Sequence, residues 1–192
     1  MSKLNIVLYS ASPRRKELLE GIGLKFRVES GSGDESFPEN LTPKEIARHI
    51  SEQKALSYDK PLEKEDVILT ADTIVVLDGK IFGKPTSREE AIEMLQALSG
   101  RKHSVITAFT IRTINEVKTF DVETIVKFKH LDIDEIVYYI DNFKPYDKAG
   151  AYGIQEWIGY IGIEKIEGSF YNVMGLPVKR VYEELSGLEI RG

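Results

Sequence analysis

LNIVLYSASPRR, residues 4–15, is the stretch that decides the predicted fold class. Its first half, Leu4 to Tyr9, is mostly apolar and is typical of a buried strand. Ser12 and Pro13 suit the cap and the first turn of a helix, because the N–H that proline lacks would be unpaired there. A strand that leads through a short turn into a helix indicates an α/β fold.

Strand and helix patterns alternate along the rest of the chain. The capping boxes Thr42–Glu45 and Ser87–Glu90 open two of the helices. Hairpins among the crossovers predict a mixed β-sheet flanked by helices, and the lack of a linker or repeat predicts a single domain over residues 1–192. The patterns predict helices from residue 12 to about 21 and over 42–58, 87–100, 132–142 and 177–185. They predict strands over 25–30, 80–82, 103–113 and 117–128. Residues 66–78 are expected to form a strand pair interrupted at 71–73, and residues 148–175 a β-like segment.

The chain has 192 residues, no cysteine and a formal net charge of −5. A domain of that length buries a core without disulfides or structural zinc. The lack of cysteine excludes thiol nucleophiles and fits a reducing compartment, so we expect a cytoplasmic protein. The first apolar run is too short for a signal peptide or a membrane span. The negative net charge argues against a nucleic-acid partner.

Two hydroxyls and two guanidinium groups surround the start of the first helix: Ser10, Ser12, Arg14 and Arg15. Unpaired N–H groups and the positive end of the helix dipole favour a bound anion such as phosphate, to which arginine adds bidentate hydrogen bonds. The alternative leaves Ser12 as a cap and both arginines in solvent. Because a positive charge in the first turn is unfavourable to the dipole, the anion interpretation is favoured slightly.

Two lysines have more than one interpretation. The helix over 42–58 has an apolar row that begins with Ile46 and Ile50, and Lys54 is the next member of this row, so a cation occupies an inward face. The alternative for Lys54 is a side chain that reaches past the apolar face to water. Lys84 follows a predicted hairpin, and on its own it reads as a surface lysine.

Carboxylates accompany these cations. Asp72 interrupts an apolar stretch at a strand end, where α/β folds keep catalytic groups, although an aspartate that forms a turn is the alternative. Asp34 and Glu35 lie in a glycine-rich loop, where solvated charges are the alternative. Carboxylates repel phosphates unless a metal bridges them, and Mg²⁺ does so with one or two carboxylates and the phosphate oxygens.

Several motifs follow one another along nearly the whole chain: SASPRR at 10–15, DE at 34–35, KA at 54–55, ADT at 71–73, GKP at 83–85, DKAGAYGIQ at 147–155 and NVMGLP at 172–177. In this order they resemble the signatures of the Maf-like nucleoside triphosphate pyrophosphatases. The resemblance implies an elongated α/β fold related to the inosine triphosphate pyrophosphatases, with two lobes around a central cleft, often as a homodimer.

The resemblance also implies an activity. The family hydrolyses a nucleoside triphosphate between the α and β phosphorus, giving the monophosphate and pyrophosphate, with a divalent cation: Mg²⁺, or alternatively Mn²⁺ or Co²⁺. Asp72 matches the proposed proton acceptor, which activates the attacking water. Ser10, Arg15, Lys54 and Lys84 fall on triphosphate-contacting positions. Glu35 matches a metal-associated carboxylate, and Asp72 is the other implied metal ligand. The implied catalytic residues are Asp72, Lys84 and Glu35, and whether Asp72 or Glu35 is the base stays open.

One subgroup of the family acts on dTTP and UTP, and a sister subgroup prefers 7-methyl-GTP. Arg14, Thr73 and Gln155 resemble the pyrimidine type, with CTP and modified pyrimidine nucleotides as further candidate substrates. Gln155 offers a donor and an acceptor, which suits the imide edge of uracil or thymine. The sequence departs from the family pattern at Tyr9 and at Glu156-Trp157.

Two alternatives stay open at this point. A nucleotide-sensing regulator of cell division would bind nucleotide without releasing pyrophosphate. A purine-type enzyme of the inosine or 7-methyl-GTP class would not depend on Gln155 for its choice between UTP and GTP.

Overall fold

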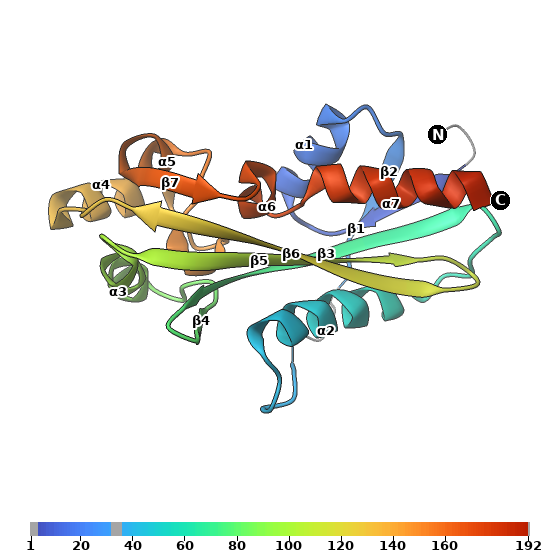
Figure 1. The fold of residues 1–192 in the computed structure, drawn as a ribbon, viewed down its shortest axis with the longest axis horizontal. Helices are drawn as coiled ribbons and strands as arrows, with labels where there is room; N and C mark the ends of the chain where they lie inside the picture. The colour runs from blue at the N-terminus through green and yellow to red at the C-terminus, as the bar shows by residue number, and fades with distance from the viewer. Residues whose placement is uncertain (1–3, 32–35, 192) are drawn as a thin grey trace. The chain divides into compact units, whose positions relative to one another are not determined.

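The computed structural model describes residues 4–31 and 36–191, with side chains as far as Leu188. Its strands form one seven-stranded sheet, consisting of β1 (Asn5–Tyr9), β2 (Phe26–Glu29), β3 (Asp66–Leu77), β4 (Lys80–Phe82), β5 (Lys102–Arg112), β6 (Val117–Phe128) and β7 (Ile163–Glu167). The order is β2-β1-β3-β5-β6-β7, and β4 pairs with β3 (Figure 1). Strand β1 pairs in parallel with β2 and β3, whereas the pairs β3–β4 and β6–β7 are antiparallel. The predicted mixed sheet is therefore confirmed.

The helical segments are α1 (Pro13–Gly21), α2 (Pro43–Leu56), α3 (Arg88–Leu98), α4 (Ile133–Phe143), the 3-10 turn η1 (Ala149–Ala151), α5 (Trp157–Gly162), α6 (Phe170–Met174) and α7 (Val178–Arg191). The five helices that the sequence predicts are present, and α7 is longer than expected. Within the described residues, no helix is both long and apolar enough to cross a membrane.

Contacts along the chain separate two compact units. Unit 1 comprises residues 1–72, 107–122 and 175–192, and unit 2 comprises residues 73–106 and 123–174. Strands β3, β5 and β6 each contribute residues to both units. The single domain over residues 1–192 stays a prediction.

Two sequence predictions are wrong in detail. Residues 66–78 do not form an interrupted strand pair, because β3 continues through Asp72 to Leu77. Aspartate has a low strand propensity, but tertiary pairing overrides such a preference. The β-like segment over 148–175 contains one strand, β7, and is otherwise largely helical. Its helices are too short to show a helical period in the sequence.

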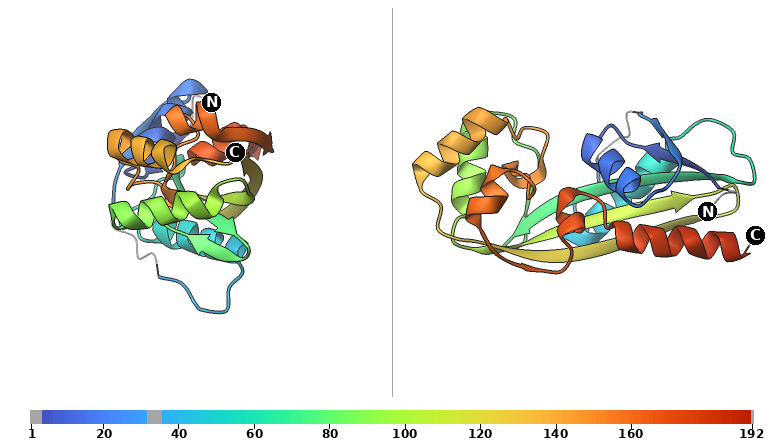
Figure 2. Two further views of the ribbon diagram at one scale, coloured as in Figure 1. Left: turned by 90° about the vertical axis from the view of Figure 1, so that its left-hand side faces the viewer. Right: turned by 90° about the horizontal axis from the view of Figure 1, so that it is seen from above.

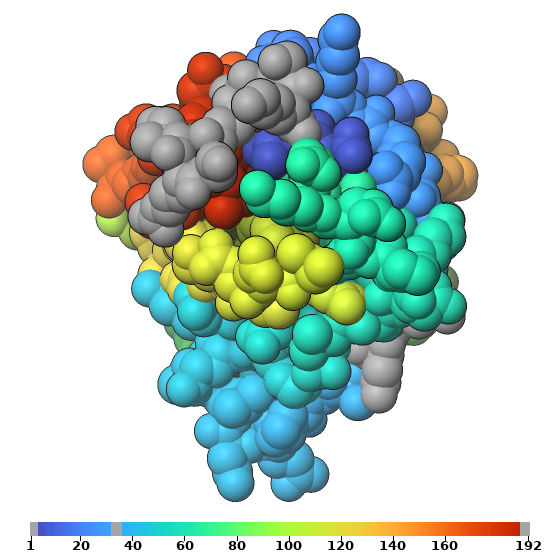
Figure 3. Space-filling view, turned by 90° about the vertical axis from the view of Figure 1, so that its right-hand side faces the viewer, coloured from blue at the N-terminus to red at the C-terminus, as the bar shows by residue number. Residues whose placement is uncertain are grey.

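Helix α2 is fixed at both ends within unit 1. Thr42 and Glu45 form the predicted capping box, in which the Thr42 N–H donates to the Glu45 carboxylate at 2.8 Å. At the other end, Arg112 Nη1 donates to the carbonyl of Ala55 in the last turn at 2.8 Å and to that of Tyr58, two residues beyond the helix, at 2.9 Å. Figure 3 shows the β5–β6 turn, in yellow, beside the teal segment that follows α2.

Helices α3 and α4 pack side by side in unit 2 (Figure 2). Arg88 on α3 makes a bidentate pair with Asp141 on α4, with distances of 2.7 and 2.9 Å. The predicted capping box at Ser87 is only half formed. Ser87 Oγ accepts the Glu90 N–H at 3.1 Å, but the Glu90 carboxylate accepts from the N–H and hydroxyl of Thr86 instead.

A buried histidine in unit 2 links stability to pH. His103 on β5 is 3% exposed, and its Nε2 lies 2.7 Å from the Tyr152 hydroxyl. Its Nδ1 is buried without a hydrogen-bond partner among the described residues. Burial lowers the pKa of His103 from 6.5 to about 4, since the charged ring loses its hydration.

We expect the free energy of unfolding to fall as the pH drops from about 6.5 to 4, because the unfolded chain binds this proton first. For a pKa shift of this size, the full loss in the free energy of unfolding is about 3 kcal/mol. Urea unfolding of the wild type and His103→Gln at pH 7 and pH 4.5 measures it, with exposed His130→Gln as the control. The same pH dependence in the wild type and His103→Gln would contradict the expectation.

Candidate functional site

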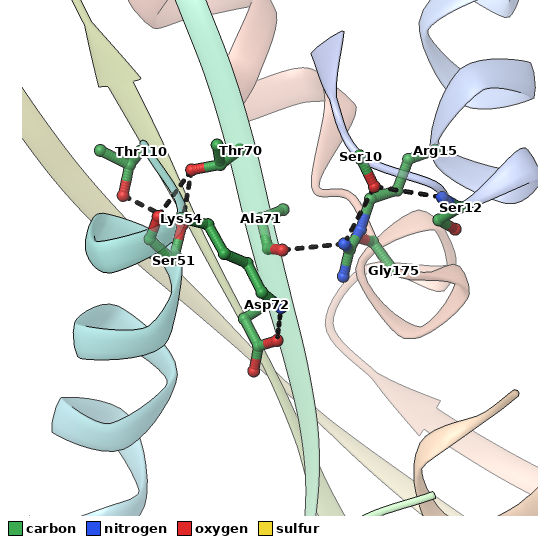
Figure 4. Close-up of polar contacts among 10 residues, drawn as sticks. All are labelled: Ser10, Ser12, Arg15, Ser51, Lys54, Thr70, Ala71, Asp72, Thr110 and Gly175. Carbon is green, nitrogen blue, oxygen red and sulfur yellow. Dashed lines mark hydrogen bonds and ion pairs between the residues drawn. The ribbon is translucent and has the colours of Figure 1, made fainter. Parts of the chain in front are cut away.

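The central contact of the candidate site joins α2 to β3 in unit 1. Lys54 Nζ on α2 lies 2.7 Å from Asp72 Oδ1 on β3, and the two side chains are 18% and 13% exposed (Figure 4). Lys54 continues the row of Ile46 and Ile50, which are both buried, so the inward orientation expected from the sequence is confirmed. Lys54 Nζ donates to Asp72 Oδ1, so this oxygen of the carboxylate is held in place. The carboxylate therefore has one oxygen fixed by a cation and one oxygen able to accept a proton.

A group of buried hydroxyls fixes the middle of α2 against the sheet. Ser51, three residues before Lys54, is fully buried, and its Oγ lies 2.9 Å from Thr110 Oγ1 on β5. Thr70 Oγ1 on β3 donates to the Ser51 backbone carbonyl at 2.7 Å. Buried hydroxyls need hydrogen-bond partners, and bonds to two strands restrict both the position of the helix along its axis and its rotation about that axis. These hydrogen bonds of Ser51 hold the turn of α2 that carries Lys54 beside Asp72 (Figure 4).

Arg15, in the first turns of α1, bonds to two distant backbone segments of unit 1. Its Nε donates to the Gly175 carbonyl at 2.9 Å, and its Nη1 donates to the Ala71 carbonyl at 2.8 Å (Figure 4). Strand β1 pairs with β3 only as far as Leu69, so Arg15 satisfies a β3 carbonyl just beyond that ladder. Because Ala71 directly precedes Asp72, Arg15 helps to fix the backbone that carries the carboxylate. Contact of Arg15 with a triphosphate stays a prediction.

The turn between β1 and α1 has the features of an anion site. Ser10 Oγ accepts the Ser12 N–H at 3.2 Å and lies 3.4 Å from Arg15 Nη1. Ser12 occupies the N-cap as predicted, but its side chain makes no capping bond to the described residues, so the first N–H groups of α1 are not capped by it. Arg14 is half-buried in the first turn. Serine hydroxyls, guanidinium groups and helix N–H groups together favour phosphate oxygens.

The remaining predicted residues within the described chain belong to unit 2. Thr73 follows Asp72 on β3 and is half-buried, and Lys84 is exposed in the connection after β4. The carbonyl of Gly83, next to Lys84, accepts the Gly150 N–H at 3.0 Å. Gln155 is half-buried, and its Oε1 is buried without a hydrogen-bond partner among the described residues. An unpaired buried acceptor of this kind is ready to accept a hydrogen bond from a ligand.

Metal ligation depends partly on residues outside the described chain. Asp34 and Glu35 lie there, so the predicted metal role of Glu35 has no structural account. Within residues 4–31 and 36–191, no three His, Asp or Glu side chains gather to form a metal cluster. Mg²⁺ needs only one or two carboxylates when phosphate oxygens and water complete its shell, so Asp72 fits this ion as a single protein ligand.

Some residues that shape the site were not found by sequence reasoning. Ser51 carried no signal, because a buried serine in an amphipathic helix looks like any small residue. Lys148 and Tyr139 form a buried cluster with Glu156 in unit 2. Lys148 belongs to the DKAGAYGIQ motif, and Glu156 stands out in the sequence only as a departure from the family pattern.

Comparison with known proteins identifies the family of this chain. The family model described as "Maf-like protein" matches residues 5–188. A dTTP/UTP pyrophosphatase of Bacteroides thetaiotaomicron is 49% identical over 98% of each chain, and one of Parabacteroides distasonis is 50% identical over 96% of each. A solved Mycobacterium abscessus structure titled "Nucleoside-triphosphatase / dITP/XTP pyrophosphatase" is 14% identical, with a TM-score of 0.44 over 97% of this chain and 94% of that one. Because the family model and relatives about half identical span nearly the whole sequence, this chain belongs to the Maf-like protein family.

Proposed function

We propose that this protein hydrolyses dTTP and UTP at the bond between the α and β phosphates, releasing the monophosphate and pyrophosphate. The observation that carries the proposal is the 2.7 Å pair of Lys54 and Asp72, in a chain whose relatives at 49% and 50% identity are named dTTP/UTP pyrophosphatases. A carboxylate beside a lysine combines a proton acceptor with a cation for phosphate oxygens.

The proposed reaction adds one water across the phosphoanhydride bond. Asp72 accepts a proton from the water through Oδ2 while Lys54 holds Oδ1, so that the carboxylate keeps its orientation. The water oxygen bonds to phosphorus as the bridging oxygen leaves with pyrophosphate. Ser10, Arg15, Lys54 and Lys84 are proposed to bind the triphosphate, because positioning and charge neutralisation supply most of the catalysis in phosphoryl transfer.

A divalent cation is proposed as the cofactor, with Mg²⁺ first and Mn²⁺ and Co²⁺ as alternatives. When bound, it neutralises charge on the phosphates, a task that suits a hard cation. Asp72 is proposed to hold it, with Glu35 as the second carboxylate implied by the family resemblance. A homodimer and a cytoplasmic location are proposed on the same resemblance, and the lack of cysteine supports a reducing compartment.

Base recognition is proposed to depend on Gln155, with Arg14 and Thr73 as further specificity residues. The buried Gln155 Oε1 lacks a partner among the described residues, and the N3–H of uracil or thymine is a donor that satisfies it. Cytosine has no hydrogen on N3. We therefore expect CTP, if it is hydrolysed, to be a poorer substrate than UTP.

A nucleotide panel tests the proposed function. Purified protein with Mg²⁺ is given dTTP, UTP, CTP, dATP, GTP, ITP or 7-methyl-GTP, and nucleotide products, pyrophosphate and free phosphate are measured together. We expect monophosphate and pyrophosphate in equal amounts, with dTTP and UTP turned over fastest. Diphosphate with free phosphate would contradict the cleavage position, a preference for ITP or 7-methyl-GTP would indicate a purine enzyme, and binding without turnover would indicate a nucleotide sensor.

A further inference from the structure

The carboxylate of Glu156, the residue after Gln155, is held at both oxygens. Its Oε1 lies 3.0 Å from Lys148 Nζ, and its Oε2 accepts a hydrogen bond from the Tyr139 hydroxyl. The Tyr139 hydroxyl in turn accepts the Gly153 N–H at 2.9 Å. Residues 153–156 are thus fastened to α4 through Tyr139 and to the preceding turn through Lys148.

This cluster is largely removed from water. Tyr139 is fully buried and Lys148 is 8% exposed, while the Glu156 side chain retains 20%. Burial, with a contribution from Glu156, raises the pKa of Tyr139, so its hydroxyl stays protonated and keeps donating. Lys148 Nζ also lies 2.8 Å from Asp147 Oδ1, so this largely buried ammonium group pairs with two carboxylates. The contacts therefore hold their geometry more firmly than a surface ion pair does.

The side chains of Glu156 and Lys148 pack closely against the backbone at Gly153. A Cβ at Gly153 would lie 2.8 Å from Glu156 Cδ and 3.0 Å from Lys148 Cε. Glycine at this position leaves room for the Glu156 carboxylate and the Lys148 side chain, whose Cε is its atom nearest to that Cβ, to pack against the backbone. The backbone at Gly153, two residues before Gln155, therefore packs directly against the side chains of Glu156 and Lys148.

Gln155 itself has no comparable anchor, because its Oε1 is buried without a hydrogen-bond partner among the described residues. Gln155 lies within residues 153–156, whose backbone is held by the contacts of Gly153 and Glu156. We propose that Glu156, held by Lys148 and Tyr139, is a positioning residue that fixes the Gln155 amide for recognition of the pyrimidine base. This inference rests on the proposed function and assigns a role to a residue at which the chain departs from the family pattern.

The first test is Glu156→Gln in the full-length protein, with kcat and KM measured for UTP and CTP. The new amide keeps the size of the side chain, but its nitrogen cannot accept a hydrogen bond from Lys148 or Tyr139. We expect the KM for UTP to rise about tenfold with kcat within about twofold, and the preference for UTP over CTP to fall about tenfold, as for loss of a binding interaction. Tyr139→Phe, which removes only the bridging hydroxyl, is expected to shift the same quantities in the same direction.

The control is Glu167→Gln on β7, where an exposed carboxylate lies 2.9 Å from Lys165 and no effect on either substrate is expected. If Glu156→Gln lowers kcat and thermal stability while the UTP to CTP preference stays at the wild-type value, Glu156 has only a structural role and the inference is overturned. If Glu156→Gln does not fold, the Tyr139→Phe result decides by the same criterion.

A double-mutant cycle separates this inference from the proposed function. We expect Gln155→Ala to remove the preference for UTP over CTP, and Glu156→Gln to change it no further in that background, because coupled residues are non-additive. If Gln155→Ala leaves the preference intact, base recognition by Gln155 is wrong. If Gln155→Ala removes the preference and Glu156→Gln alone does not reduce it, only the positioning role fails.

Discussion

Asp72→Asn is expected to lower the rate of pyrophosphate release by about 10²- to 10⁴-fold, the usual contribution of a general base. Asparagine has nearly the same shape, and its amide oxygen still accepts from Lys54 Nζ, which lies 2.7 Å from Asp72 Oδ1. What it lacks is an oxygen that takes up a proton. We therefore expect kcat to fall while the thermal unfolding midpoint stays near that of the wild type.

Asp78→Asn is a matched control for this variant. Asp78 follows β3 in an exposed turn with a φ of 50°, a conformation that asparagine tolerates well. Its activity should equal that of the wild type. Turnover by Asp72→Asn within about tenfold of the wild type would show that another group is the base. Glu35→Gln should then carry the large loss instead.

Lys54→Met should reduce kcat/KM for dTTP by about 10²-fold, the scale seen when one preorganised donor to a developing charge is removed. Methionine fills the space of the lysine stem and keeps the apolar packing of α2, but it removes the ammonium group. Asp72 then loses the bond that orients its carboxylate, and the triphosphate loses a cation. We expect both a higher KM and a lower kcat in steady-state assays of pyrophosphate release.

Two companion variants define what Lys54 contributes. Lys60→Met removes an exposed lysine that pairs with Glu29, and it should leave activity unchanged. Lys54→Arg keeps the charge but replaces a compact ammonium group with a planar fork, so it should recover only part of the loss. Equal activity of Lys54→Met and Lys60→Met would refute a role for Lys54 in the reaction.

The two groups of the central contact were predictable from local pattern. Lys54 stood out because it continues the apolar row of Ile46 and Ile50, and a helix period places these residues on one face. Asp72 stood out because a charged residue broke an apolar run. What the pattern could not give was their contact, because they belong to different elements and their approach depends on tertiary packing.

Other parts of the site leave no local signal. Ser51 acts through Thr70 and Thr110, and no spacing rule links three hydroxyls from a helix and two strands. The anchoring of Glu156 by Tyr139 is equally non-local. Asp72 was also misleading for the fold, because a break in hydrophobicity suggested two strands where β3 is continuous. Pairing of β3 with its neighbours outweighs one unfavourable residue.

Arg15 also bears on how the protein is made. Its guanidinium group bonds to Ala71, 56 positions along the chain, and to Gly175, 160 positions along. Translation delivers the N-terminus first, so Arg15 leaves the ribosome long before Gly175 has been added. Closing so large a loop is entropically costly and slow. We therefore expect a ribosome-stalled nascent chain that ends before Gly175 to hydrolyse no nucleotide, so that the enzyme acquires activity only as its synthesis finishes.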